Sequence, residues 1–153
     1  GGARGKGRGL MALWKLDLEG FDEIAKRMTR NEAGVGKVVD EMLKAGGAVL
    51  QEEFRAEIKR TFTKRPTGDL AKSIRVGKVK HTSTSAWVEI KPVGKNKHKQ
   101  NRARIGTVLE YGRSPYKSGK GRIRATLWVT NTHKRAKSKI HNAMMEVWVQ
   151  SGL

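Results

Sequence analysis

The spacing of apolar positions predicts one long helix in the first half of the chain. Between residues 35 and 62, apolar side chains recur at steps of three and four and so fall on one helical face: Val39, Leu43, Leu50, Phe54 and Ile58. Gly46 and Gly47 interrupt this face, and each costs about 1 kcal/mol relative to Ala inside a helix. We therefore expect that another backbone approaches closely there, or that the helix kinks.

Two shorter patterns precede the long helix, and a second helical pattern ends the chain. Residues 13–18 alternate between apolar and polar, which predicts a half-buried strand. Residues 21–28 have the spacing of a short helix, with acids in its first turn and bases in its last. Near the other end, Ala136, Ile140, Met144 and Val147 predict an amphipathic helix that begins at residue 125 or 130 and ends near 149.

The middle of the chain alternates between short apolar runs and polar connections. Residues 73–80 and 85–91 read as two strands joined by the polar segment 81–84. A turn at 64–68, containing Pro66, ends the region of the long helix. Residues 105–111 are apolar, but their periodicity fits a strand and a short helix equally well.

These elements predict the fold class α+β, with a small, mainly antiparallel β-sheet packed against one long α-helix and with a C-terminal α-helix. The 153 residues are about the size of one domain, which we assign to residues 12–153. Residues 1–11 are basic and rich in Gly, so they bury too little apolar surface to offset the entropy of ordering. We interpret them as a flexible segment that is an upstream or cloning remnant, with Met11 as the start, rather than as a nucleic-acid-binding arm.

Charge changes the picture, because it is concentrated in one part of the chain. The chain has 33 Lys and Arg against 14 Asp and Glu, a net charge of +19. Residues 91–124 alone carry eleven bases and one acid, a net charge of +10. Such a density repels itself unless a polyanion or an acidic protein surface neutralises it. We expect the loops 92–104 and 112–124 to form a surface that faces DNA or an acidic neighbour, through Lys91, Lys95, Lys97, Lys99, Arg102, Arg104, Arg113, Lys117, Lys120, Arg122 and Arg124.

Enzymatic motifs fail when their spacing is tested. The chain has no Cys, and no pair of His has the spacing of a helical metal site. Gly34 to Lys37 resembles a phosphate loop, but Val38 stands where a Ser or Thr must follow the Lys. Glu110 beside Tyr111 is the best candidate for a nuclease centre, but no defined motif supports it. We therefore assign no catalytic residue, no metal ligand, no cofactor and no membrane segment, and we predict that the protein is not an enzyme.

Three motifs occur in an order that resembles a known family. They are Gly20-Phe21-Asp22-Glu23-Ile24 after a short strand, Arg65-Pro66-Thr67-Gly68-Asp69-Leu70-Ala71-Lys72-Ser73-Ile74 after the long helix, and Val108-Leu109-Glu110-Tyr111-Gly112-Arg113-Ser114 after two strands. This order resembles the tail-completion (neck, head–tail joining) morphogenesis proteins of long-tailed bacteriophages, over residues 16–149. The chain departs from the family at residues 123–128, where both usual prolines are missing.

The resemblance implies a structural virion protein with a single tail-completion-like domain over residues 12–153. Such a protein forms a ring of identical subunits, six-fold by this expectation, at the head–tail junction, after assembly in the host cytoplasm. Its implied partners are an adjacent neck or portal-side connector protein, a tail-tube or tail-terminator protein, and the genomic double-stranded DNA that passes through. The ring joins or completes the tail.

The motif residues receive structural roles from the same resemblance: Thr67, Gly68, Leu70, Ile74, Glu110, Tyr111 and Gly112. Thr67 to Leu70 offers a side-chain cap, a permissive Gly and an apolar anchor where a helix turns into a strand. Glu110 to Gly112 reads as the end of an element that packs into the core or into a subunit seam.

A second class of protein also fits the composition, namely a small basic nucleic-acid-binding protein of cellular origin. The four Trp residues weaken this alternative, because they do not lie among the basic runs as stacking platforms would. The oligomeric state with and without DNA distinguishes the two classes.

Overall fold

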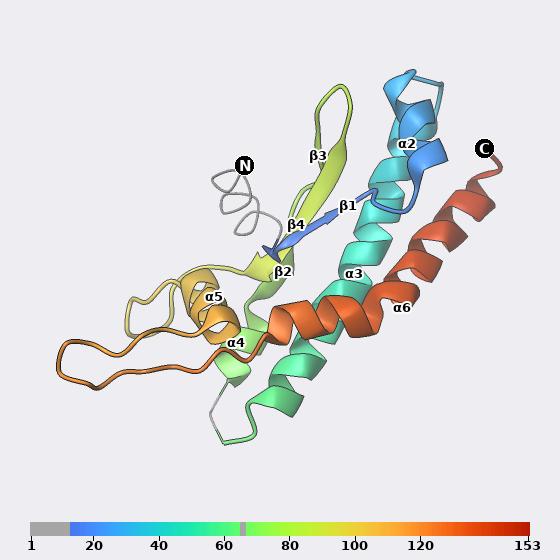
Figure 1. The fold of residues 1–153 in the computed structure, drawn as a ribbon. Coiled ribbons are helices and arrows are strands. Elements are labelled where there is room, and N and C mark those ends of the chain that lie inside the picture. The colour runs from blue at the N-terminus through green and yellow to red at the C-terminus, as the bar shows by residue number, and fades with distance from the viewer. Residues whose placement is uncertain (1–12, 65–66) are drawn as a thin grey trace. The chain divides into compact units, whose positions relative to one another are not determined.

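The computed structural model describes residues 13–64 and 67–153, and it confirms the α+β class (Figure 1). The predicted segment 1–11, together with Arg65 and Pro66 of the predicted turn, lies outside these residues. The elements are β1 (Lys15–Asp17), α2 (Asp22–Thr29), α3 (Val35–Thr61), α4 (Gly68–Lys72), β2 (Ile74–Val76), β3 (Lys80–His81), β4 (Ala86–Pro92), α5 (Arg102–Tyr111) and α6 (Trp128–Ser151).

The sheet is small and is organised around β4. Its strand order is β1-β4-β2, and β3 also pairs with β4. β1 and β3 run antiparallel to β4, with Leu16 opposite Val88 and His81 opposite Ala86. The apolar residues of β4 are buried in alternation, as their spacing predicts. The expectation that His81 belongs to the polar connection is wrong, because this residue pairs within the sheet before Thr82 and Ser85 close the turn.

The chain forms two compact units, which we describe one at a time. Within the described residues, the first unit consists of residues 13–50, Val76–Ile90 and Ala136–Leu153. The second consists of residues 51–64 and 67–75 together with Lys91–Arg135. The assignment of residues 12–153 to a single domain stays a prediction.

The paired glycines of α3 make room for side chains in the first unit. A Cβ on Gly46 would lie 2.8 Å from Cγ of Met144 and 2.9 Å from Cδ2 of Leu16. A Cβ on Gly47 would lie 3.0 Å from Cγ1 of Val76. The atoms nearest to both positions are side-chain atoms of β1, β2, β4 and α6.

The core of the second unit is built where α3 meets the start of α6. The ring of Phe54 lies 5.4 Å from that of Trp128 and 5.7 Å from that of His133, both in edge-to-face geometry. The indole N–H of Trp128 donates to the carbonyl of Gly106 at 3.0 Å, which attaches α5 to the same core. This core positions α5 and the loops on either side of it.

Candidate binding surface

The cations identified from the sequence lie in the second unit, and all but Lys91 and Arg124 belong to two structures. The first is the loop before α5 together with the first turn of α5. The second is a hairpin loop over residues 113–123. Residues 105–111, for which the sequence left strand and helix open, are helical, and α5 begins at Arg102. Arg102 and Arg104 therefore stand on a helix, so the expected loop 92–104 ends at residue 101.

The loop before α5 is held in shape by Asn96. Its side-chain oxygen accepts hydrogen bonds from the backbone N–H groups of His98 at 2.9 Å and Gln100 at 3.0 Å. Its side-chain N–H donates to the Gln100 side chain at 2.9 Å. A backbone bridge between Lys95 and Asn101 closes the loop. The lysines of this loop are thus presented on a structured turn.

Arg102 has a structural partner, and that partner is a carboxylate. Its guanidinium donates two hydrogen bonds to the carboxylate of Asp69, at 2.8 and 2.9 Å, and a third to the carbonyl of Val93 at 3.2 Å. The hydrogen bond from Arg102 lowers the pKa of Asp69 below 3.8, and the carboxylate in turn raises the pKa of Arg102. This pair connects α4 to α5.

The junction between α5 and α6 is formed by a buried carboxylate. Glu110 has no exposed surface, and its carboxylate accepts the backbone N–H of Val129 at 2.6 Å and that of Thr130 at 3.3 Å. The hydroxyl of Thr130 donates to the same carboxylate. Glu110 therefore caps the N-terminus of α6, where a negative charge is stabilising. Glu110 is therefore packed into the core at the end of α5, and the subunit seam stays a prediction.

The rest of this motif turns the chain out of α5. Gly112 has φ +78° and ψ −177°, a conformation essentially confined to glycine. A Cβ there would lie 2.6 Å from the carbonyl oxygen of Ile123 and 2.7 Å from the backbone N of Ala125. Tyr111 is about half exposed. The pKa of its phenol is raised, mainly because the group is partly buried and to a smaller extent because the charge of Glu110 is close.

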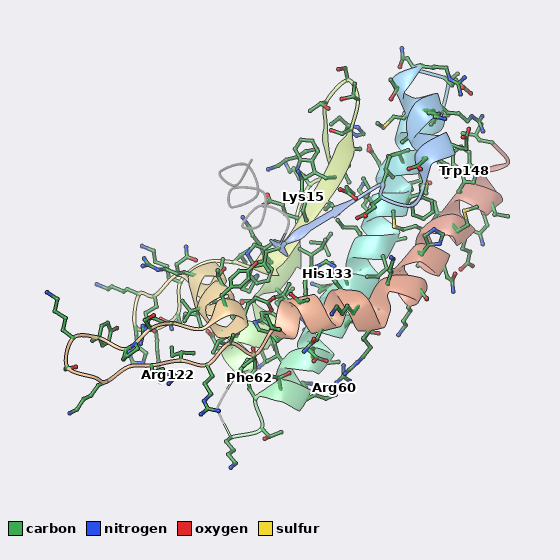
Figure 2. All side chains as sticks on the ribbon, viewed as in Figure 1. Lys15, Arg60, Phe62, Arg122, His133 and Trp148 are labelled. Atoms are coloured by element: carbon green, nitrogen blue, oxygen red, sulfur yellow. The ribbon has the colours of Figure 1, made fainter. Side chains whose placement is uncertain are left out.

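The hairpin is fastened at its base by Arg113. The Arg113 guanidinium donates twice to the carbonyl of Gly121, at 3.1 and 2.8 Å, and lies 4.8 Å from the ring centre of Tyr116. A backbone bridge joins Arg113 to Ile123. Arg113 therefore maintains the hairpin, and the hairpin extends beyond it (Figure 1), with Arg122 on its return strand (Figure 2).

Nine of the eleven proposed cations make no ion pair with a carboxylate within residues 13–64 and 67–153. They are Lys95, Lys97, Lys99, Arg104, Arg113, Lys117, Lys120, Arg122 and Arg124. Lys91 lies in β4, whose residues alternate between buried and half-buried. The only acid of residues 91–124 is Glu110, which is buried in its capping role. The positive charge of these unpaired side chains is thus uncompensated within the described residues.

A groove runs along α5, between the loop before it and the hairpin. Its volume is about 700 Å³. Lys95, Lys99, Arg104 and Arg113 supply charged groups to its lining, together with Gln100 and Asn101. Ile105, Val108, Leu109 and Ile123 supply an apolar floor. The combination of a cationic rim and an apolar floor was not apparent from the sequence, because it requires α5 to be helical and the hairpin to fold back.

The turn motif before β2 follows the expected plan only in part. Leu70 and Ile74 are buried, so they are the apolar anchors that the motif predicts. The predicted side-chain cap is wrong, because Thr67 precedes α4 without a capping hydrogen bond from its side chain. Gly68 does not have a positive φ, so its conformational freedom is not used. The acid in this turn, Asp69, has the larger role through its pair with Arg102.

Residues 13–64 and 67–153 contain no group of three or more His, Asp or Glu side chains arranged to hold a metal ion. None of their helices is both long and apolar enough to cross a membrane.

The molecule is an α+β protein whose distinctive surface is a cationic groove and hairpin carried by a small helical scaffold. The HK97-gp10-like family, described as "Bacteriophage HK97-gp10, putative tail-component", matches residues 22–112, from the start of α2 to the glycine that ends α5. The match covers more than half of the chain, so the chain belongs to this family and is a structural tail component of a bacteriophage virion. No curated protein and no solved structure matches the chain significantly.

Proposed function

We propose that the protein forms a ring of identical subunits in the neck of a long-tailed bacteriophage, at the head–tail junction. The ring has six-fold symmetry, joins or completes the tail, and lets the genomic DNA pass. Membership of a tail-component family supports this assignment. Its partners are the adjacent connector on the portal side, the tail tube or tail terminator, and the DNA itself.

The observation that carries the DNA part of the proposal is the hairpin of residues 113–123. Lys117, Lys120 and Arg122 lie on it, and none of the three is paired with a carboxylate in the described chain. Phosphate contacts of this kind do not depend on base sequence, which suits a protein that every part of a genome passes. The hairpins of a ring would line its channel with positive charge.

Exposed apolar side chains support docking to other proteins. In the second unit, Val93, Tyr111, Tyr116 and Leu127 are between 39% and 59% exposed. In the first unit, Met145, Val149 and Leu153 project from the last turns of α6 and the residues after it, with Val149 at 67%. Large apolar groups gain from burial at about 25 cal/mol per Å², so their exposure favours contacts with subunits or partners.

The DNA part is tested by replacing the three hairpin cations with Gln and measuring binding to duplex DNA at several salt concentrations. We expect weaker binding to every sequence, and a salt slope shallower by about 3, since each lost phosphate contact removes about 0.9 from the slope. Arg113 is kept, because it fastens the hairpin.

The matched control is Lys44→Gln, Lys59→Gln and Lys134→Gln, which removes the same charge from exposed helical positions. If the control lowers affinity and slope as much as the hairpin variant, net charge alone attracts DNA and the hairpin has no special role.

The location is tested by imaging intact virions and by deleting the gene in the phage. We expect density for this chain at the junction, and unjoined heads and tails without it. Normal particles in the deletion strain, combined with nucleic-acid binding by a monomer, would instead favour the cellular nucleic-acid-binding alternative.

A further inference from the structure

The groove along α5 has features that a DNA-binding surface does not need. Duplex DNA presents phosphates to a protein, and an apolar floor adds nothing to phosphate contacts. A volume of about 700 Å³ is that of a pocket for a few side chains. Ile105, Val108 and Ile123 are half-buried, so an occupant that covers them also removes water from around Lys95 and Arg104. Charge pairs formed there are stronger than pairs in open solvent.

The same chain carries an exposed surface of opposite sign in its first unit. Asp17, Glu19, Asp22 and Glu23 lie within seven residues that contain no base, and all four are exposed. We name these four residues the acidic edge. No other stretch of seven residues in the chain carries as many acids without a base.

The acidic edge is a structured turn between β1 and α2. The carboxylate of Asp17 accepts the N–H of Glu19 at 2.9 Å, and the N–H of Phe21 donates to the carbonyl of Leu18 at 2.9 Å. The ring of Phe21 stacks on His141 at 4.2 Å and anchors the turn to α6. An edge fixed in this way loses little conformational entropy when it docks.

We infer that the groove along α5 is the docking site for the acidic edge of a second copy of this chain. The inference rests on the proposed ring and names the two surfaces that meet in it. Because the two surfaces differ, each copy can offer its groove to one neighbour and its acidic edge to another. A heterologous contact of this kind builds a ring when its rotation closes, as the proposed ring requires. A symmetric contact of groove with groove would instead oppose like charges, which costs several kcal/mol.

Charge reversal in full-length protein tests the pairing, with self-association measured by sedimentation. The groove variant is Lys95→Glu with Arg104→Glu, and the edge variant is Glu19→Lys with Asp22→Lys. We expect each variant alone to associate roughly 10-fold to 100-fold more weakly than the wild type, because each opposes like charges in the interface. We expect an equimolar mixture of the two to associate nearly as well as the wild type, since each reversed surface then meets its complement.

Matched controls change the same charge elsewhere on exposed positions. Lys59→Glu with Lys134→Glu controls for the groove, and Glu41→Lys with Glu52→Lys controls for the edge. We expect both controls to associate as the wild type does. Circular dichroism of each variant reports whether it is folded.

Three results would overturn the pairing. They are a wild-type chain that stays monomeric at millimolar concentration, folded reversal variants that associate normally, and a mixture that fails to recover association. If the wild-type chain stays monomeric, the groove binds a different partner. That partner is DNA if the groove variant also has a lower affinity for duplex DNA, and another protein if its affinity is unchanged. None of these results removes the protein from the head–tail junction, which imaging of virions decides separately.

Discussion

At the scale of single residues, Gly112 is the position where the sequence has the least freedom. Its backbone conformation is one that other residues rarely adopt. Two backbone atoms also lie only 2.6 and 2.7 Å from the position that a Cβ would occupy. Gly119, in the same hairpin region, has φ +82° but open space around it. Replacing each glycine by Ala therefore distinguishes two contributions to the loss of stability, the unfavourable backbone conformation and the steric crowding of the new methyl group.

We expect Gly112→Ala to lower the free energy of unfolding by about 3 kcal/mol, from strain and overpacking together. Gly119→Ala should cost about 1 kcal/mol, the conformational part alone. Urea denaturation of both variants measures the difference. Equal losses would show that the backbone near Ile123 moves freely to accept the methyl group.

Glu110 is the second residue whose role is set by its surroundings. In Glu110→Gln, one oxygen is replaced by an NH₂ group that faces the N–H and O–H donors of Val129 and Thr130. We expect a loss of about 1–3 kcal/mol, the range for a buried hydrogen-bonding group left unsatisfied. The control Glu41→Gln, exposed on α3, should change the unfolding free energy by less than about 0.5 kcal/mol. A variant at residue 110 with wild-type stability would contradict the capping role.

At the scale of elements, the pair of Asp69 and Arg102 makes the attachment of α4 to α5 sensitive to pH. The folded pKa of Asp69 is lower than its unfolded value, so the pair stabilises the fold above about pH 4. This contribution is lost as the pH falls through the lowered pKa. We expect Arg102→Gln to remove that part of the acid dependence and to reduce stability at neutral pH.

Unfolding curves at pH 7 and at several values below pH 4 measure this effect. The control is Arg104→Gln. Arg104 lies two residues after Arg102 in α5 and has no carboxylate partner in the described chain. The assignment fails if the Arg102 and Arg104 variants lose stability with acid in parallel.

The elements that the sequence predicts well are the ones with long, regular apolar periodicity. The spacing in α3 and α6 locates both helices, because their faces are buried over many turns. α5 is short and mixes small, apolar and charged residues, so its pattern does not separate helix from strand. The single strand predicted over residues 73–80 is instead two short strands, β2 and β3. The extension of β3 to His81 was not predicted, since this residue is exposed and polar and belongs to the sheet through backbone pairing.

The binding surface is predictable as charge but not as geometry. The concentration of bases in residues 91–124 identifies the region. The roles of Arg102 and Arg113 as fasteners depend on partners that only folding brings near, Asp69 in α4 and the carbonyl of Gly121. The groove depends on the same contacts. The spacing of residues along the sequence therefore predicts neither the roles of these two arginines nor the groove.

At the scale of the whole molecule, the two units carry surfaces of opposite charge. The unpaired cations of residues 91–124 belong to the second unit, and the acidic edge belongs to the first. A chain with both signs on separate surfaces can neutralise part of its net charge of +19 through its own copies. Higher salt should then weaken self-association and DNA binding alike, because both depend on exposed charges.

The fastening of the hairpin has a practical consequence. Arg113, Gly121 and the bridge to Ile123 close its base, so residues 117–120 can change without disturbing the core of the second unit. Lengthening such a loop costs little, about 0.6 kcal/mol for each doubling. A fluorophore or an affinity epitope inserted between Ser118 and Gly119 would therefore report where this end of the protein sits in an assembled particle.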